Sequence, residues 1–319
     1  MPVTRDAVSY AYRYLLNREP ESETAIETHI GAQDWQALRR VFTASGEYQA
    51  SIQPQGAQEA VGIGRHLDAS SVQIDVTASP RQLAAMIDRI SASWRSFGET
   101  APHYSVLTNP IFLPENLAAH LDSFFGHGRH DVEAMLRYVS RAGLPVKFGR
   151  ALDFGCGVGR MTIALAHYAD ETVGVDISAG HLREAMAEAR QRGLENAEFK
   201  QINKLDDIGE LGSFDLIISR IVLQHNPPPV MAEIYRRLLS LLAPSGVAVV
   251  QMPTFIKGYR FDSASYVESE IEPMEMNALP QREIYRIIAD AECILLEVRE
   301  DDHLGVVDGL SHTFAVQKP

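Results

Sequence analysis

Cysteine is scarce in this sequence, since Cys156 and Cys293 are the only two among 319 residues. Two thiols are too few for a disulfide framework or for a zinc site built from thiolates, and the 11 histidines are scattered. We therefore expect no metal site.

Basic residues are outnumbered by acidic ones, since 29 basic and 42 acidic side chains give a net charge of −13. Phosphate backbones repel such a chain, so we expect no nucleic-acid partner.

Long apolar runs are missing as well. The longest, such as the segment 238–243, are far shorter than the roughly 20 residues that span a bilayer. The first residues, MPVTRDAVSYAYRY, hold no apolar core of the signal-peptide type. The apolar fraction of 45% and the charged fraction of 22% are nevertheless ordinary for a folded globular chain. We expect a cytoplasmic protein that does not span a membrane.

The hydrophobic pattern changes several times along the chain. It predicts a helical accessory domain at 1–50, a linker at 51–80, a helical lead-in or lid at 81–149, and an α/β domain at 150–319 with an insertion at 253–280.

Within residues 1–50, apolar side chains recur at three- and four-residue spacing, which is typical of amphipathic helices. Asp34 is expected to cap the last of these helices, with Trp35, Leu38 and Val41 on one side.

The lead-in shows three helical patterns, at 81–97, 115–125 and 131–143. Trp94 belongs to an apolar stripe of the first and is expected to be buried. The HGRH tetrapeptide at 127–130 is expected at the surface before the last helix.

Short apolar runs and amphipathic helices alternate after Arg150, a pattern typical of βαβ units. The last two runs are joined by a short link, as in a hairpin. The sequence therefore predicts a Rossmann-like α/β fold with a mostly parallel seven-stranded sheet and one antiparallel strand. The expected strands are 150–154, 171–177, 197–202, 214–219, 246–252, 293–300 and 312–318.

The strongest chemical signal is LDFGCGVGR at 152–160. An apolar strand is followed by Gly155, Gly157 and Gly159, which allow a tight turn and a close approach of backbone to a ligand. The next strand ends at Asp176, where a carboxylate can accept the hydroxyl protons of a ribose. The loop therefore predicts a nucleotide-like ligand.

Two features decide which nucleotide-like ligand is expected. The NAD fingerprint requires a third glycine at the position of Arg160. Asp153 would also place a second anion beside a pyrophosphate. A ligand with a cationic end avoids that repulsion, and S-adenosylmethionine provides both this end and a ribose.

These segments, together with VGVDIS and FDLIISRIVLQH, resemble the class I S-adenosylmethionine-dependent methyltransferases over residues 150–318. The resemblance implies that Asp153 and the glycines lie by the methionine portion and Asp176 by the ribose. It implies a cofactor site made of Asp153, Gly155, Cys156, Gly157, Gly159, Arg160, Asp176, Ile177, Asn203, Ser219 and Arg220.

His225 follows the fourth predicted strand, at the sheet edge where ligands of open α/β sheets bind. It is the candidate general base for a hydroxyl acceptor. The alternative is that it packs beneath the following helix. Gln224 and two tyrosines, Tyr104 in the lead-in and Tyr259 in the insertion, are candidate substrate contacts. The insertion aromatics fit either a lid or a small satellite core.

The segment YAYRYLLNREPES resembles a small helical domain of unknown function found in bacterial glycan-related proteins. The resemblance implies a bacterial protein whose acceptor is a saccharide or a glycolipid precursor, and a small-molecule acceptor stays open beside it. The alternative is a bundle for docking, including a homodimer through this domain.

We expect O-methylation more than N-methylation. The rivals are a noncatalytic cofactor-binding scaffold, an NAD-dependent oxidoreductase and a nucleic-acid methyltransferase. The last would need a basic surface and often has an Asn/Asp-Pro-Pro-Tyr/Phe loop, where this chain has SRIVLQHNPP.

Overall fold

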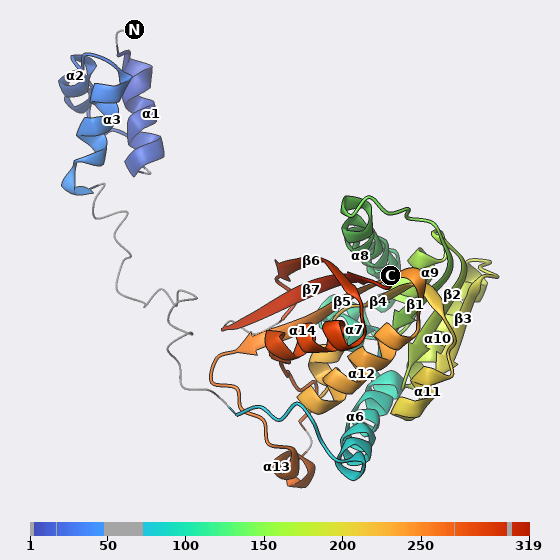
Figure 1. Ribbon diagram of the computed structural model, residues 1–319. Coiled ribbons are helices and arrows are strands. Elements are labelled where there is room, and N and C mark those ends of the chain that lie inside the picture. The colour runs from blue at the N-terminus through green and yellow to red at the C-terminus, as the bar shows by residue number, and fades with distance from the viewer. Residues whose placement is uncertain (1–2, 17, 48–72, 271, 305–307) are drawn as a thin grey trace. The chain divides into compact units, whose positions relative to one another are not determined.

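The computed structural model describes residues 3–16, 18–47, 73–270, 272–304 and 308–319 (Figure 1). The chain divides into two compact units, residues 1–71 and 72–319. The predicted linker lies largely outside the described residues.

The first unit holds three helices, α1 (Arg5–Leu16), α2 (Glu23–Ile30) and α3 (Trp35–Thr43). Asp34 caps α3, as predicted, because its carboxylate accepts a hydrogen bond from the amide of Ala37 at 2.8 Å. The predicted face of α3 is wrong in part. Leu38 is buried together with Phe42, four residues on, whereas Trp35 and Val41 are each 50% exposed. The buried face of α3 therefore follows the i, i+4 spacing of Leu38 and Phe42.

The second unit contains the predicted seven-stranded sheet, in the order β3-β2-β1-β4-β5-β7-β6. Strand β7 is antiparallel to both of its neighbours, and the other neighbouring pairs are parallel. The fold prediction is confirmed. The strands are β1 (Phe148–Phe154), β2 (Ala169–Asp176), β3 (Ala197–Gln201), β4 (Phe214–Ser219), β5 (Leu242–Ile256), β6 (Ile294–Asp301) and β7 (Gly309–Gln317).

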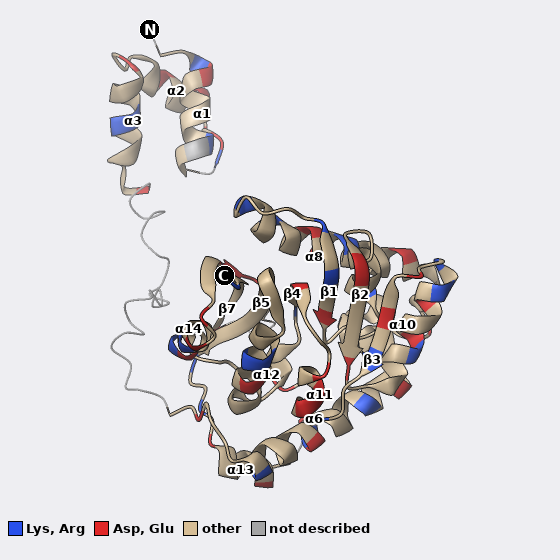
Figure 2. Cartoon of the chain, turned by 45° about the vertical axis from the view of Figure 1, so that its right-hand side comes forward, with Lys and Arg blue, Asp and Glu red and all other residues tan. Residues whose placement is uncertain are grey.

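Helices cover the sheet (Figures 1 and 2). The α-helices of this unit are α6 (Pro80–Thr100), α7 (Pro102–Val106), α8 (Leu121–Arg141), α9 (Arg160–Leu165), α10 (Ala179–Gln191), α11 (Leu205–Gly209), α12 (Pro228–Ser240), α13 (Ser263–Glu268) and α14 (Gln281–Asp290). Single 3-10 turns occupy η1 (Pro110–Phe112), η2 (Leu117–Ala119) and η3 (Leu223–His225).

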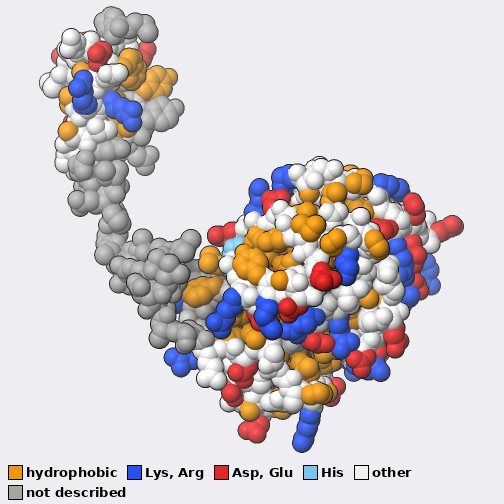
Figure 3. Space-filling view, in the orientation of Figure 1, with side chains coloured by type: hydrophobic (Ala, Val, Ile, Leu, Met, Phe, Trp, Pro, Cys, Tyr) orange, Lys and Arg blue, Asp and Glu red, His pale blue; other side chains and the backbone are white. Residues whose placement is uncertain are grey.

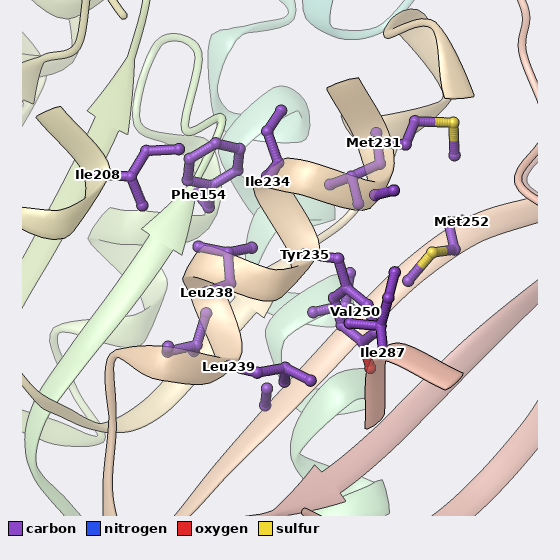
Figure 4. Packing of buried hydrophobic residues seen from close by; sticks show 14 of the residues in the cluster. Phe154, Ile208, Met231, Ile234, Tyr235, Leu238, Leu239, Val250, Met252 and Ile287 are labelled. Carbon is purple, nitrogen blue, oxygen red and sulfur yellow. The ribbon is translucent and has the colours of Figure 1, made fainter. Parts of the chain in front are cut away.

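Two apolar cores result from the alternation of side chains along the strands. In β4, Ile217 packs with α6, α12 and α14, whereas Leu216 and Ile218 pack with α8 and α9. Figure 4 shows the first core around α12, where Tyr235 and Leu238 are fully buried. Burial of both sheet faces explains why the strands read as continuous apolar runs.

The lead-in differs from its prediction in how its helices are divided. The expected helices at 115–125 and 131–143 are largely one helix, α8, preceded by the turn η2. The HGRH tetrapeptide therefore lies inside α8. Its Gly128 is buried against the start of α9. A Cβ at this position would lie 2.2 Å from the Arg160 carbonyl oxygen, which is too close for any side chain. This glycine lets α8 pack directly on the start of α9.

The insertion aromatics pack against the first core. Phe261 is 6% exposed, and Tyr259 and Tyr266 lie against the same cluster. The amide of Phe261 donates to the carbonyl of Gln73, which ties the insertion to the beginning of this unit. The packing supports the satellite-core interpretation of these side chains.

Candidate active site

A pocket with about 1130 Å³ of empty space, its open mouth included, lies at the carboxyl ends of β1, β2 and β4. Helices α6 and α11 lie beyond these strand ends (Figure 2), and both contribute side chains to the pocket wall. The predicted site residues that line it are Asp153, Gly155, Cys156, Gly157, Arg160, Asp176, Ile177, Asn203, Arg220 and His225.

The glycine loop needs its glycines for two reasons. Gly155 and Gly157 have φ angles of +77° and +54°, a region that favours glycine. A Cβ at Gly155 would lie 2.4 Å from a methyl carbon of Val222, and one at Gly157 would lie 2.6 Å from a methyl carbon of Val106. The loop therefore presents bare backbone to the pocket. Gly159 is not among the lining residues, and its missing Cβ leaves room for Phe199 instead.

Asp176 connects this loop to the next helix. Its Oδ2 accepts a hydrogen bond from the Gly157 amide and its Oδ1 accepts one from the Ser178 amide, both at 2.9 Å. Each carboxylate oxygen has a second lone pair for a ligand hydroxyl. The geometry therefore fits a ribose contact.

His181 also lines the pocket, although sequence reasoning did not select it. Its Nε2 lies 2.8 Å from Ser105 Oγ, and its Nδ1 lies 3.8 Å from Asp176 Oδ1. The ring is 1% exposed. Its position in the first turn of α10, capped by Ser178, is the only signal in the sequence.

Asp153 ends β1 and is 3% exposed. Its Oδ2 accepts a hydrogen bond from Thr162 Oγ1 at 2.7 Å. Burial raises the pKa of Asp153 to about 6. The carboxylate is thus mostly ionised at neutral pH and available to a cationic ligand group.

Arg160 and Arg220 share one carboxylate. Arg160 Nη1 lies 2.5 Å from Asp131 Oδ2, and Arg220 Nη2 lies 3.1 Å from Asp131 Oδ1. All three side chains are at most 13% exposed. Burial lowers the pKa of Arg220. Sequence reasoning named both arginines but missed Asp131, which comes from α8.

His225 is held in one tautomer. Its Nδ1 lies 3.0 Å from the carbonyl oxygen of Glu275, and a carbonyl can only accept, so Nδ1 bears the hydrogen. Nε2 then keeps the lone pair that a general base requires. Burial lowers the pKa of His225 to about 4, so the ring is neutral at physiological pH. The pocket position supports a catalytic role, while the low pKa makes the ring a weak base.

Trp94 differs from its prediction. It lines the pocket, is only partly buried, and contacts His225 in a tilted arrangement with ring centroids 5.1 Å apart. Its stripe partner Met86 is fully buried. The last turns of α6 reach beyond the sheet. The same apolar stripe therefore packs in the core near the start of α6 and lines the pocket near its end.

Five predicted site residues do not line the pocket: Gly159, Ser219, Gln224, Tyr104 and Tyr259. The Ser219 hydroxyl donates to the Phe154 carbonyl at 3.0 Å, and that of Tyr259 donates to Asn277 Oδ1 at 2.6 Å. Gln224 Nε2 lies 3.5 Å from Nε2 of His225, behind the pocket wall. In α7, Ser105 and Val106 face the pocket in place of Tyr104.

Among the predicted residues that do line the pocket, Asn203 already accepts a hydrogen bond from Arg95 at 3.1 Å.

Replacing His225 by glutamine is expected to reduce the loss of stability in acid. The unfolded histidine takes up a proton below its usual pKa of about 6.5, whereas the folded one stays neutral to about 4. Native stability that depends on His225 is therefore present above pH 6.5 and is lost as the pH falls toward 4. The full pKa difference of His225 between the unfolded and folded states corresponds to about 3 kcal/mol of unfolding free energy. We expect a loss of about 2 kcal/mol, because the ring is partly open to the pocket.

Urea unfolding of both proteins at pH 6.5 and pH 4.5 measures this difference. Asp153 contributes with the opposite sign, because its raised pKa favours the folded state below about pH 6. It is present in both proteins and cancels in the comparison. A constant difference between the two proteins across this range would contradict the assignment.

Within the described ranges, no group of three or more His, Cys, Asp or Glu side chains is arranged to hold a metal ion. The described helices also include none that is both long and apolar enough to cross a membrane. On the face of the larger unit in Figure 3, basic and acidic side chains are interspersed.

Comparison with known proteins identifies the larger unit. Residues 147–292 match the family described as "Methyltransferase domain". This segment is similar to the members of that family. The match covers less than half of the chain and agrees with the predicted class, an S-adenosylmethionine-dependent methyltransferase. The pocket fits that cofactor, because two glycines keep Cβ atoms out of it and Asp176 offers carboxylate oxygens at the end of β2. The resemblance of residues 1–50 to a known domain stays a prediction.

Two curated relatives resemble parts of the chain. The ubiquinone biosynthesis O-methyltransferase of Azorhizobium caulinodans is 28% identical over 185 residues, which cover 55% of this chain and 63% of the relative. The trans-aconitate 2-methyltransferase of Deinococcus radiodurans is 40% identical over 111 residues, which cover 33% of this chain and 38% of the relative. The chain therefore spans less than two thirds of the length of each of these relatives.

The chain is also similar to solved structures at low identity. The N-methyltransferase NodS of Bradyrhizobium japonicum, in complex with S-adenosylhomocysteine, has a TM-score of 0.48 at 17% identity, over 73% of this chain and 100% of NodS.

Proposed function

We propose that this protein transfers a methyl group from S-adenosylmethionine to a hydroxyl oxygen of a small-molecule or saccharide acceptor. The observation that carries the proposal is the pocket itself, in which Asp176, the glycine loop and His225 line one cavity. The O-methyltransferase relative in ubiquinone biosynthesis favours oxygen over nitrogen as the methyl acceptor.

Asp176 would bind the ribose hydroxyls of the cofactor, and Asp153 would lie near its cationic end. When bound, S-adenosylmethionine supplies an electrophilic methyl group on a sulfonium. The task of the protein is to hold the acceptor hydroxyl in line with that group and to exclude water. Trp94 and the apolar side chains of α6 line the pocket and would serve the second purpose.

His225 Nε2 would accept the hydroxyl proton as the new bond forms. The Glu275 carbonyl fixes the tautomer in which Nε2 bears no hydrogen, and the only described polar neighbour of that lone pair is the Gln224 amide at 3.5 Å, the limit of a hydrogen bond. The neutral ring needs no prior deprotonation, because its pKa is about 4.

The experiment that tests the proposed function is methyl transfer from radiolabelled S-adenosylmethionine to a panel of phenols, sugars and hydroxy acids, with matched amines. Labelled methyl ethers or esters and stoichiometric S-adenosylhomocysteine support it. Transfer to amines alone would contradict O-methylation. Cofactor binding without transfer to any acceptor would favour a noncatalytic scaffold.

Asp176→Ala is expected to weaken S-adenosylhomocysteine binding at least tenfold, or about 1.4 kcal/mol, because hydrogen bonds from two ribose hydroxyls are lost. Calorimetric titration measures the change. Asp170→Ala is the matched control, since Asp170 lies on the same strand but is 74% exposed and paired with Lys147. Equal affinity of both variants would remove the ribose assignment.

The N-terminal unit is proposed as a docking domain that joins two copies of the chain. About half of each of the Tyr10, Trp35 and Val41 side chains is exposed there. Light scattering on the full chain tests this proposal, and the mass of a single copy would contradict it.

A further inference from the structure

Two buried guanidinium groups in the pocket wall face a single carboxylate. Arg160 and Arg220 both pair with Asp131, at 2.5 Å and 3.1 Å. Among the described residues, Asp131 is the only acidic side chain in an ion pair with either arginine. Counted by direct ion pairs, the cluster therefore has two guanidinium groups for one carboxylate, in a largely buried place.

Other nearby carboxylates have different partners. Asp153 accepts a hydrogen bond from Thr162, and Asp301 accepts one from Thr313. Asp302 is 97% exposed and lies beside His303. They act on the arginines through space, but they do not take up the guanidinium hydrogens.

Some N–H donors of the two guanidinium groups also lack hydrogen-bond partners among the described residues. The Nε atoms of Arg160 and Arg220 are buried and have no hydrogen-bond partner among the described residues. Arg160 is 4% exposed as a whole, and both residues line the pocket. A largely buried cation that exceeds its direct counter-charges is unfavourable unless an anion joins it.

The position of the pair favours the acceptor over other ligands. Arg220 directly follows β4, and His225 comes five residues later in the same loop and lines the same pocket. An acceptor with one end at the arginines would direct another part toward His225.

We propose that the methyl acceptor is a carboxylic acid whose carboxylate is bound by Arg160 and Arg220. The inference rests on the proposed function and names its substrate class. A guanidinium matches a planar carboxylate with two parallel hydrogen bonds. The one guanidinium in excess of direct carboxylate partners matches a monoanion better than a doubly charged phosphate. The cofactor also has a methionyl carboxylate, so the experiment separates the two sources.

The test is calorimetric titration of the protein saturated with S-adenosylhomocysteine. The probes are acetate, benzoate and 4-hydroxybenzoate, each compared with its uncharged amide. We expect at least one carboxylate to bind ten times or more tighter than its amide. Arg220→Met should abolish this preference, and Arg220→Lys should retain part of it. Arg183→Met should leave it unchanged, because Arg183 is 59% exposed and pairs with Glu99 outside the pocket.

Arg220→Met leaves Arg160 and Asp131 as a balanced pair, so the variant is expected to fold, and its affinity for S-adenosylhomocysteine should stay within about twofold of wild type. A tenfold loss of that affinity would assign the arginine to the methionyl carboxylate and overturn the proposal. No preference for any carboxylate in the wild type, or a preference that survives in Arg220→Met, would also overturn it. Failure of the wild type to bind S-adenosylhomocysteine would instead overturn the proposed function, and this inference with it.

Discussion

His225→Gln is expected to lower turnover about 100-fold while leaving the affinity for S-adenosylhomocysteine within about twofold of wild type. The hydrogen bond from Nδ1 to the Glu275 carbonyl leaves Nε2 as the only proton acceptor of the ring. Glutamine can still donate to that carbonyl, but its amide is not a useful base at neutral pH. Turnover and affinity therefore separate the proton-accepting role from simple packing.

Steady-state kinetics with an acceptor found in the panel measure this effect. His167→Gln is the matched control, because His167 is exposed and lies outside the pocket. With a pKa of about 4 for His225, the wild-type rate should not decline between pH 7 and pH 5 through this group. Nearly normal turnover of the His225→Gln enzyme would contradict the general-base role and indicate that His225 only packs in the structure.

Asp131→Asn is expected to destabilise the larger unit by about 3 kcal/mol, because it removes the shared counter-charge and leaves two buried guanidinium groups together. The substitution keeps the shape of the side chain, so loss of charge dominates. Asp122→Asn is the control, since Asp122 is exposed on the same helix, α8. Urea unfolding of the full chain measures both variants.

The double variant Asp131→Asn with Arg220→Met makes the test specific. Removing one arginine relieves the repulsion, so the double variant should be more stable than Asp131→Asn alone by about 1 kcal/mol or more. An additive result, in which the second substitution brings no recovery, would show that the three side chains are not coupled.

The fold was predictable because its signals are local. Each strand of the sheet is a short apolar run, and the helices between the first five strands have their own periodicity. The glycine loop and Asp176 were predictable for the same reason, because a strand, a turn and a helix follow one another within a few residues.

The rest of the site depends on tertiary packing. Asp131 lies 29 residues before Arg160 and 89 before Arg220, and the three meet only because Gly128 allows α8 to pack on α9. No pattern in the sequence connects them. Trp94 was placed in the core because a helical stripe gives the face of a helix but not where the core ends.

Calorimetric titration of the purified full chain with S-adenosylmethionine, S-adenosylhomocysteine and NAD, in parallel, tests the central claim most directly. The fold, the glycine loop and Asp176 predict micromolar binding of the first two and none of the third. Binding of NAD alone would contradict this account of the loop. No binding of any of the three would contradict cofactor-dependent catalysis by the isolated chain.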